Sequence, residues 1–81
     1  MQTTPLAELV ALAECLRSLG GDSVVWSDHR NHVEALARGE AHCRGLEHAD
    51  VWAEVWSELG RARLAGFRVD VRWLSSHPKR P

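Results

Sequence analysis

The sequence predicts a small α/β domain in which helices alternate with two parallel strands. Two segments, 6–19 and 51–59, repeat apolar residues at the three- and four-residue spacing of an amphipathic helix. Two others are typical of strands: Ser23–Ser27 is rich in β-forming residues, and Phe67–Leu74 alternates apolar and charged residues. Because helices join the two strands, we expect the strands to pair in parallel.

The chain has 81 residues, so we expect one domain that spans residues 1–81. Ten basic and eleven acidic residues give a net charge of −1, which does not indicate a general nucleic-acid-binding surface but leaves a local one open. The amino terminus has no secretory pattern, and no stretch approaches the length of a membrane span. With only Cys15 and Cys43, we expect an intracellular, reducing location, no disulfide and no membrane contact.

The first helix is expected to begin at Thr4-Pro5, because Thr suits the N-cap and Pro suits the first helical position. Gly20-Gly21 is expected to stop it. Its apolar stripe comprises Leu6, Leu9, Val10, Leu12, Ala13, Leu16 and Leu19.

The run Ser23–Ser27 is continuously rich in β-formers, so we expect a strand buried on both faces, with Asp28 at its carboxyl end. A helix is predicted over residues 29–38, and Gly39 ends it. The residues expected to face inward from this helix are Val33, Leu36 and Ala37.

Residues 40–47 are polar and are expected to form a loop. The next helix is predicted to begin near His48 or Ala49, to tolerate Gly60 and to extend to Leu64. Its stripe is typical of a core-facing helix: Val51, Trp52, Val55, Trp56 and Leu59. The order is therefore helix, strand, helix, helix, strand.

Ligand sites of open parallel sheets form beyond the carboxyl ends of the strands. Asp28 follows the first strand, and His77 lies in the loop after the second. Glu8 lies in the early turns of the first helix and meets Asp28 if that helix runs antiparallel to the strand. Two carboxylates repel each other unless a cation binds, and oxygen ligands favour Mg²⁺ or Mn²⁺ over Zn²⁺. Spacing alone favours ordinary roles: a solvated Glu8, Asp28 as an N-cap, and His77 without a role.

Four segments resemble the ribonuclease H family. Thr3–Leu12 resembles its first helix, which carries a metal-binding Glu just before a Leu. Val24–His29 is similar to its next strand, which ends in a metal-binding Asp. Ala49–Trp52 resembles the start of a later helix, and Val69–His77 resembles the last strand and the mobile loop that bears a catalytic His. Together the four motifs lie in the family's order and are spread along the chain from Thr3 to His77.

The resemblance implies metal-dependent hydrolysis of the RNA strand in RNA–DNA hybrids by a two-metal mechanism. It makes Glu8 and Asp28 ligands of Mg²⁺ (or Mn²⁺), and it makes His77 a catalytic residue that assists proton transfer or product departure. The family's first three strands and its last helix have no counterpart here, so we expect a partial ribonuclease H-like fold. The first of those strands and the last helix each carry one further Asp in the family, so two of its four carboxylates are absent. Ser76 and His29 replace a Gly and a Ser of the family motifs.

In a partial fold the Val24–Trp26 strand has an unpaired edge, so we expect that the chain either is a fragment or self-associates through this edge. Two chains paired antiparallel there would form a four-stranded homodimer. Three interpretations follow. The first is a ribonuclease H-type nuclease, or a piece of one from a longer polyprotein such as a reverse transcriptase. The second is a non-catalytic module of the same origin that binds nucleic acid or itself. The third is a small interaction domain in which the carboxylates are incidental.

Overall fold

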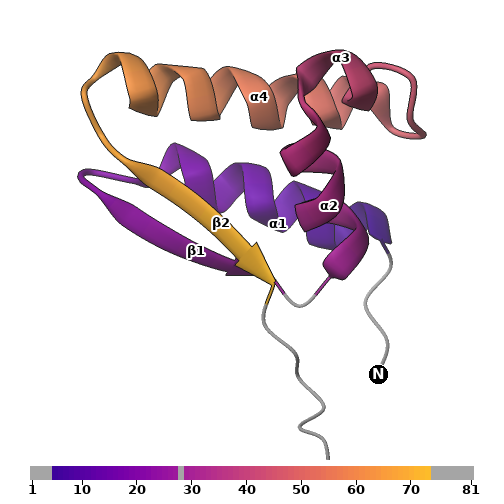
Figure 1. Cartoon of the computed structure of the whole chain (residues 1–81), viewed down its shortest axis with the longest axis horizontal. Helices are drawn as coiled ribbons and strands as arrows, with labels where there is room; N and C mark the ends of the chain where they lie inside the picture. Colours follow the sequence, from indigo (N-terminus) through magenta and orange to yellow (C-terminus); the bar gives the residue numbers. More distant parts are fainter. Residues whose placement is uncertain (1–4, 28, 74–81) are drawn as a thin grey trace, which may run out of the picture.

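The computed structural model describes residues 5–27 and 29–73. Their secondary structure consists of α1 (Pro5–Arg17), β1 (Ser23–Ser27), α2 (Arg30–Arg38), α3 (Glu40–Cys43), α4 (Ala49–Leu64) and β2 (Val69–Trp73). The two strands pair in parallel. Each of α1 and α4 runs back antiparallel to the strand that follows it, and the two helices lie side by side (Figure 1). The predicted α/β class and the parallel strand pair are therefore confirmed.

The contact between α1 and α4 forms most of the hydrophobic core. The buried residues of the two helices are Leu9, Leu12, Ala13, Leu16, Trp52, Val55, Leu59 and Ala62. Leu6 and Val10 are 38% and 42% exposed, so the predicted stripe of α1 is wider than the one that packs. At the carboxyl end of α1, Arg61 Nη2 donates to the carbonyls of Leu16 and Arg17 at 3.5 and 3.0 Å. These bonds satisfy carbonyls that a helix end leaves without intrahelical partners.

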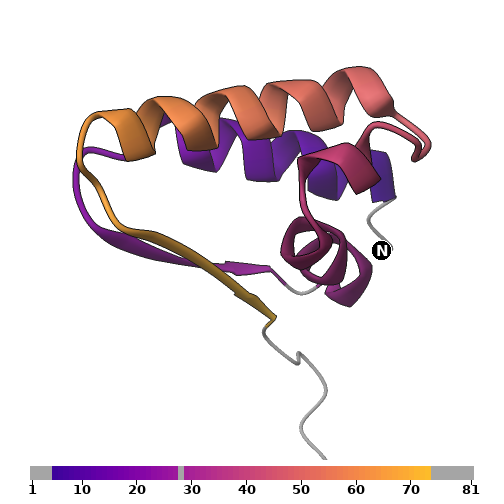
Figure 2. The same ribbon diagram turned by 45° about the horizontal axis from the view of Figure 1, so that its top comes forward.

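The strand pair is covered on one face only. Val25 is buried, whereas Val24 and Trp26 are 52% and 55% exposed. The prediction that β1 is buried on both faces is therefore wrong. The register sets the two exposed residues beside Asp70 and Arg72, so they share a partly charged outer face. Figure 2 shows α1 and α4 on one side of the strands and no described helix on the other.

The predicted loop over residues 40–47 contains the short helix α3, so that prediction is wrong. Gly39 has φ of 107°, which lets the chain turn sharply between α2 and α3. Cys43 is fully buried, and its thiol lies 3.4 Å from the Ala35 carbonyl oxygen, to which it donates. A buried thiol and its bond to α2 therefore hold a helix that has no apolar periodicity of its own.

The inward face of α2 differs from the predicted one. His32 and Ala35 are buried, Val33 and Leu36 are only partly buried, and Ala37 is exposed. The helix is rotated in this way because α3 and α4 cover the His32–Ala35 side. The side predicted to be buried borders an open groove instead.

The last helix was predicted to tolerate Gly60 and to extend to Leu64. This prediction is confirmed, because α4 continues through Gly60 to Leu64. Gly66, with φ of 92°, follows it at the turn into β2. No described helix is long and apolar enough to cross a membrane. Cys15 is exposed and Cys43 is buried, and both are free thiols.

Two other elements begin or end inside their predicted ranges. Helix α1 ends at Arg17, before the two glycines, and β2 begins at Val69 rather than at Phe67. Leu74, the last residue of the predicted strand, lies outside the described residues. The predicted N-cap Thr4 and the predicted tail from Ser75 to Pro81 lie outside the described residues.

Candidate functional site

Glu8 lies in the first turn of α1, where its side chain is half-buried. No described residue forms an ion pair or a hydrogen bond with its carboxylate. Because α1 runs antiparallel to β1, its first turn and the carboxyl end of β1 lie at the same end of the molecule (Figure 1). Asp28 follows that strand directly, but Asp28 and His77 both lie outside the described residues. The convergence of Glu8 with Asp28, and the role of His77, therefore stay predictions.

The donor chemistry at this end fits a hard cation only in part. Glu8 offers carboxylate oxygens, which Mg²⁺ and Mn²⁺ accept. Within residues 5–27 and 29–73, however, no group of three or more His, Cys, Asp or Glu side chains is placed to hold a metal ion. Further ligands for a metal at Glu8 must therefore come from outside the described residues. Asp28 is the further ligand that the sequence predicts.

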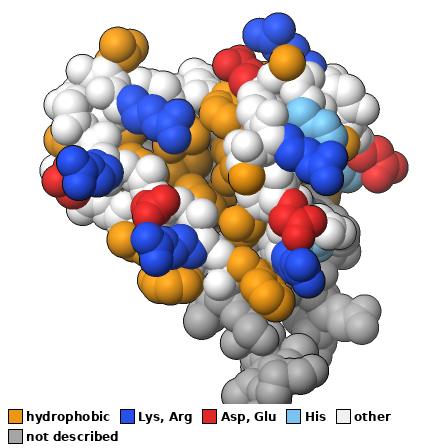
Figure 3. All heavy atoms as spheres, in the orientation of Figure 1, with side chains coloured by type: hydrophobic (Ala, Val, Ile, Leu, Met, Phe, Trp, Pro, Cys, Tyr) orange, Lys and Arg blue, Asp and Glu red, His pale blue; other side chains and the backbone are white. Residues whose placement is uncertain are grey.

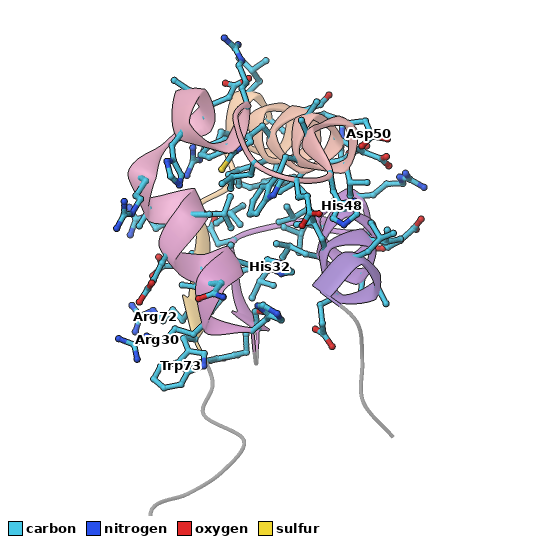
Figure 4. All side chains as sticks on the ribbon, turned by 90° about the vertical axis from the view of Figure 1, so that its right-hand side faces the viewer. Arg30, His32, His48, Asp50, Arg72 and Trp73 are labelled. Carbon is cyan, nitrogen blue, oxygen red and sulfur yellow. The ribbon has the colours of Figure 1, made fainter. Side chains whose placement is uncertain are left out.

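An aromatic and basic cluster lies at the carboxyl end of β2. The guanidinium carbon of Arg30, from the first turn of α2, lies 5.2 Å from the centroid of the Trp73 ring. Figure 4 shows Arg30, Arg72 and Trp73 close together at this end. The Arg30 and Arg72 side chains are 64% and 59% exposed, and Trp73 is 44% exposed. Exposed guanidinium groups bind phosphates, and an exposed aromatic ring stacks on bases, so the cluster suits a nucleic-acid backbone.

Both arginines already have acidic neighbours. Arg30 Nε lies 2.8 Å from Glu34 Oε2, one helical turn away, and Arg72 Nη2 lies 2.9 Å from Asp70 Oδ2. Such exposed pairs are weak, so a phosphate displaces the carboxylate at little cost. The sequence pattern assigns Arg30 no role. The feature of the sequence that could have indicated a role for Arg30 is its position, two residues after Asp28 and at the start of the helix that follows a strand.

A stack of aromatic rings anchors the beginning of α2. The rings of His29 and His32 are stacked with centroids 4.1 Å apart and an interplanar angle of 14°. The His32 ring also meets the Trp52 ring edge-on at 5.6 Å. Neither histidine Nδ1 has a hydrogen-bond partner among the described residues.

His32 is 8% exposed, and this burial, together with the charge of His29, lowers the pKa of His32 to about 4. It is therefore neutral near pH 7 and packs as part of the core. The sequence pattern assigns His32 no role either. The feature of the sequence that could have indicated its contact with His29 is the three-residue spacing between the two histidines.

The arrangement thus offers one half-buried carboxylate and an exposed cation–aromatic cluster at the same end of the molecule. Comparison with known protein families, curated protein sequences and solved structures finds no match to this chain. The four quoted motifs therefore remain the basis for the ribonuclease H resemblance.

Proposed function

We propose that this chain is a ribonuclease H-like module that binds RNA–DNA hybrids and contributes to metal-dependent hydrolysis of their RNA strand. The observation that carries the proposal is the shared end of the molecule. The first turn of α1 with Glu8, the end of β1 and the Arg30–Trp73 pair all lie there. The parallel strands and the order of α1, β1, α2, α4 and β2 are also those that the resemblance implies, and the short helix α3 is an addition to that order.

In this proposal Arg30 and Arg72 hold backbone phosphates, and Trp73 stacks on a sugar or base. Glu8 and Asp28 hold Mg²⁺ or Mn²⁺. When bound, the metal supplies an activated water and stabilises the leaving oxygen. His77 moves a proton or assists product departure. Two carboxylates are fewer than the four of the family, so we expect efficient hydrolysis to require further acidic ligands.

The first test is cleavage of a labelled RNA–DNA hybrid with Mg²⁺ or Mn²⁺. We expect the original chain by itself to cut the RNA strand only slowly, and we expect the Glu8→Gln and Asp28→Asn variants to lose this activity. Glu47→Gln is the matched control, because Glu47 is exposed and has no described partner. Cleavage that survives in both variants contradicts the assigned ligands.

Binding is measured separately, by fluorescence anisotropy of the same hybrid in EDTA and in Mg²⁺. Arg30→Ala and Trp73→Ala are expected to weaken binding, whether or not cleavage occurs. Binding without cleavage favours the non-catalytic module over the nuclease. If a folded sample neither binds nor cuts the hybrid, both forms of the proposal are wrong.

A second candidate function is self-association, which the exposed Val24 and Trp26 favour. The Ser23 N–H donates to the Arg68 carbonyl at 2.8 Å, so the backbone groups of Val24 and Trp26 point to the other edge of β1. Antiparallel pairing of two such edges, centred on Val25, sets Trp26 of one copy opposite Val24 of the other. Aromatic and β-branched residues form favourable pairs across strands.

Sedimentation velocity at micromolar concentration tests this candidate. We expect a dimer for the original chain and a monomer for Trp26→Lys. Leu64→Lys is the control, because Leu64 is 92% exposed at the far end of α4 and lies outside the expected interface. A monomeric original chain contradicts the candidate.

A further inference from the structure

A shallow apolar groove lies between α2, α4 and β2. Its volume is about 220 Å³. Apolar residues form most of its lining, among them Val33, Leu36, Trp56, Leu59, Val69 and Val71. Figure 3 shows this hollow as hydrophobic atoms near the centre of the face, between two lobes with charged surfaces. Most of these side chains are only partly buried, so the groove presents apolar surface to solvent.

One wall of the groove is a strand edge with backbone groups available for pairing. Within the described residues β2 has β1 as its one neighbour. The Arg68 carbonyl accepts from Ser23, so the backbone groups of Asp70 face β1 as well. The N–H and C=O groups of Val69 and Val71 therefore face the opposite, free edge. Their side chains contribute to the groove, so the edge and the groove form one continuous surface.

The groove also carries a cation. Arg63, in the last turn of α4, lines it and has no ion pair with any described residue. Asp70 lines the groove too, but its carboxylate is paired with Arg72 at 2.9 Å. The groove therefore has an uncompensated positive charge, which complements an acidic ligand.

We propose that this groove binds an extended peptide segment of a partner protein, which adds a strand to the free edge of β2. Alternate apolar side chains of the segment enter the groove, and an acidic side chain pairs with Arg63. A small molecule fits less well, because the volume is below the roughly 300–1,000 Å³ of typical small-molecule sites. The segment Pro78-Lys79-Arg80-Pro81 is basic, so it has the wrong charge to pair with Arg63.

This inference uses none of Glu8, Asp28, Arg30 or Trp73, and it shares only Arg72, the ion-pair partner of Asp70, with the proposed function. The probe is a capped hexapeptide that alternates valine and threonine and carries an aspartate at one end. It is titrated into the isotope-labelled chain and followed by NMR. We expect saturable shifts of the Val69 and Val71 amides, with a Kd on the order of 100 µM. A peptide with lysine in place of the aspartate, and one with a central proline, are expected to bind at least about tenfold more weakly.

The matched variants are Arg63→Glu and Arg38→Glu. Both arginines lie in the last turn of a helix and lack a described ion pair, but Arg38 is outside the groove. Arg63→Glu is expected to weaken binding of the aspartate peptide about tenfold and to strengthen binding of the lysine peptide. Arg38→Glu is expected to change the affinity for neither peptide.

Three results overturn the inference, provided that the spectra show folded samples. The first is no shift of Val69 or Val71 with the aspartate peptide at millimolar concentration. The second is an equal effect of the two substitutions. The third is a dimer that Arg63→Glu dissociates, because a second copy of the chain then occupies the groove.

Discussion

The helix pair and the strand pair differ sharply in how much of their surface is buried. Leu16 and Val55, where α1 and α4 meet, have no exposed surface, whereas Val24 and Trp26 on the strands are more than half exposed. Apolar burial is the main favourable term in folding, so the helix pair supplies most of the stability. The strand pair instead positions side chains: it sets Trp73 beside Arg30 and holds the edge that borders the groove.

The largest expected effect lies in the helix pair. Leu16→Ala should lower the free energy of unfolding by about 2–5 kcal/mol, because it removes fully buried methyl groups and leaves a cavity. Urea denaturation followed by circular dichroism measures the loss. Leu64→Ala is the control and should change stability by less than about 0.5 kcal/mol. Similar losses in both variants would show that the helix contact is not the core.

The next effect concerns pH. His32 has a pKa of about 4 in the folded chain and about 6.5 when unfolded, so the unfolded state binds more protons between these values. The free energy of unfolding is therefore unaffected by protonation of His32 above about pH 6.5. As the pH falls from there towards 4, protonation of His32 in the unfolded state lowers the free energy of unfolding by about 3 kcal/mol in total.

Urea midpoints measured from pH 7.5 to 4 test this dependence. His32→Leu should flatten the profile, while His42→Leu, at an exposed histidine, should leave it unchanged. A slope that persists in His32→Leu would assign the dependence to other groups.

A smaller effect is expected where α4 contacts the end of α1. Arg61→Ala removes the hydrogen bonds to the carbonyls of Leu16 and Arg17 and should cost about 1 kcal/mol, since this guanidinium is half exposed. Arg63→Ala, two residues away and without a described ion pair, is the comparison and should be nearly neutral. Thermal unfolding of both variants distinguishes them, and equal melting temperatures would contradict the capping role of Arg61.

The smallest effect is expected on the open face of the strands. Val24→Thr keeps a β-branched residue at a position that is already half exposed, so stability should change by less than about 0.5 kcal/mol. The same urea titration measures it. A loss of more than about 1 kcal/mol would mean that this face is covered in solution, as the proposed dimer requires.

The sequence predicted those elements whose own pattern determines them. The periodic stripe around Trp52 and Val55 defined α4, and the alternation of β2 defined a strand with one charged face. The run Val24–Trp26 could not show which face is covered, because continuous apolar residues occur both in strands buried on two faces and in strands buried on one. Helix α3 was missed because its four residues carry no period; it depends on the burial of Cys43 against α2.

The candidate site was predictable to a similar extent. Glu8 lies in the first turn of α1, as its position after Pro5 indicated. The pairing of Arg30 with Trp73 was not predictable, because it joins two elements that are far apart in the chain. The burial of His32 likewise depends on the position of Trp52 in α4.

The parallel strand pair also has a consequence for the order of folding. Asp22, just before β1, accepts from the Arg68 N–H at 2.8 Å, a contact between residues 46 positions apart. The α1–α4 contact is equally non-local, so the two main contacts between elements form only when most of the chain is present. High contact order slows folding. During synthesis β1, with Val24, Val25 and Trp26, leaves the ribosome well before β2 exists to pair with it. The nascent chain therefore exposes an aggregation-prone segment that the completed chain only half covers.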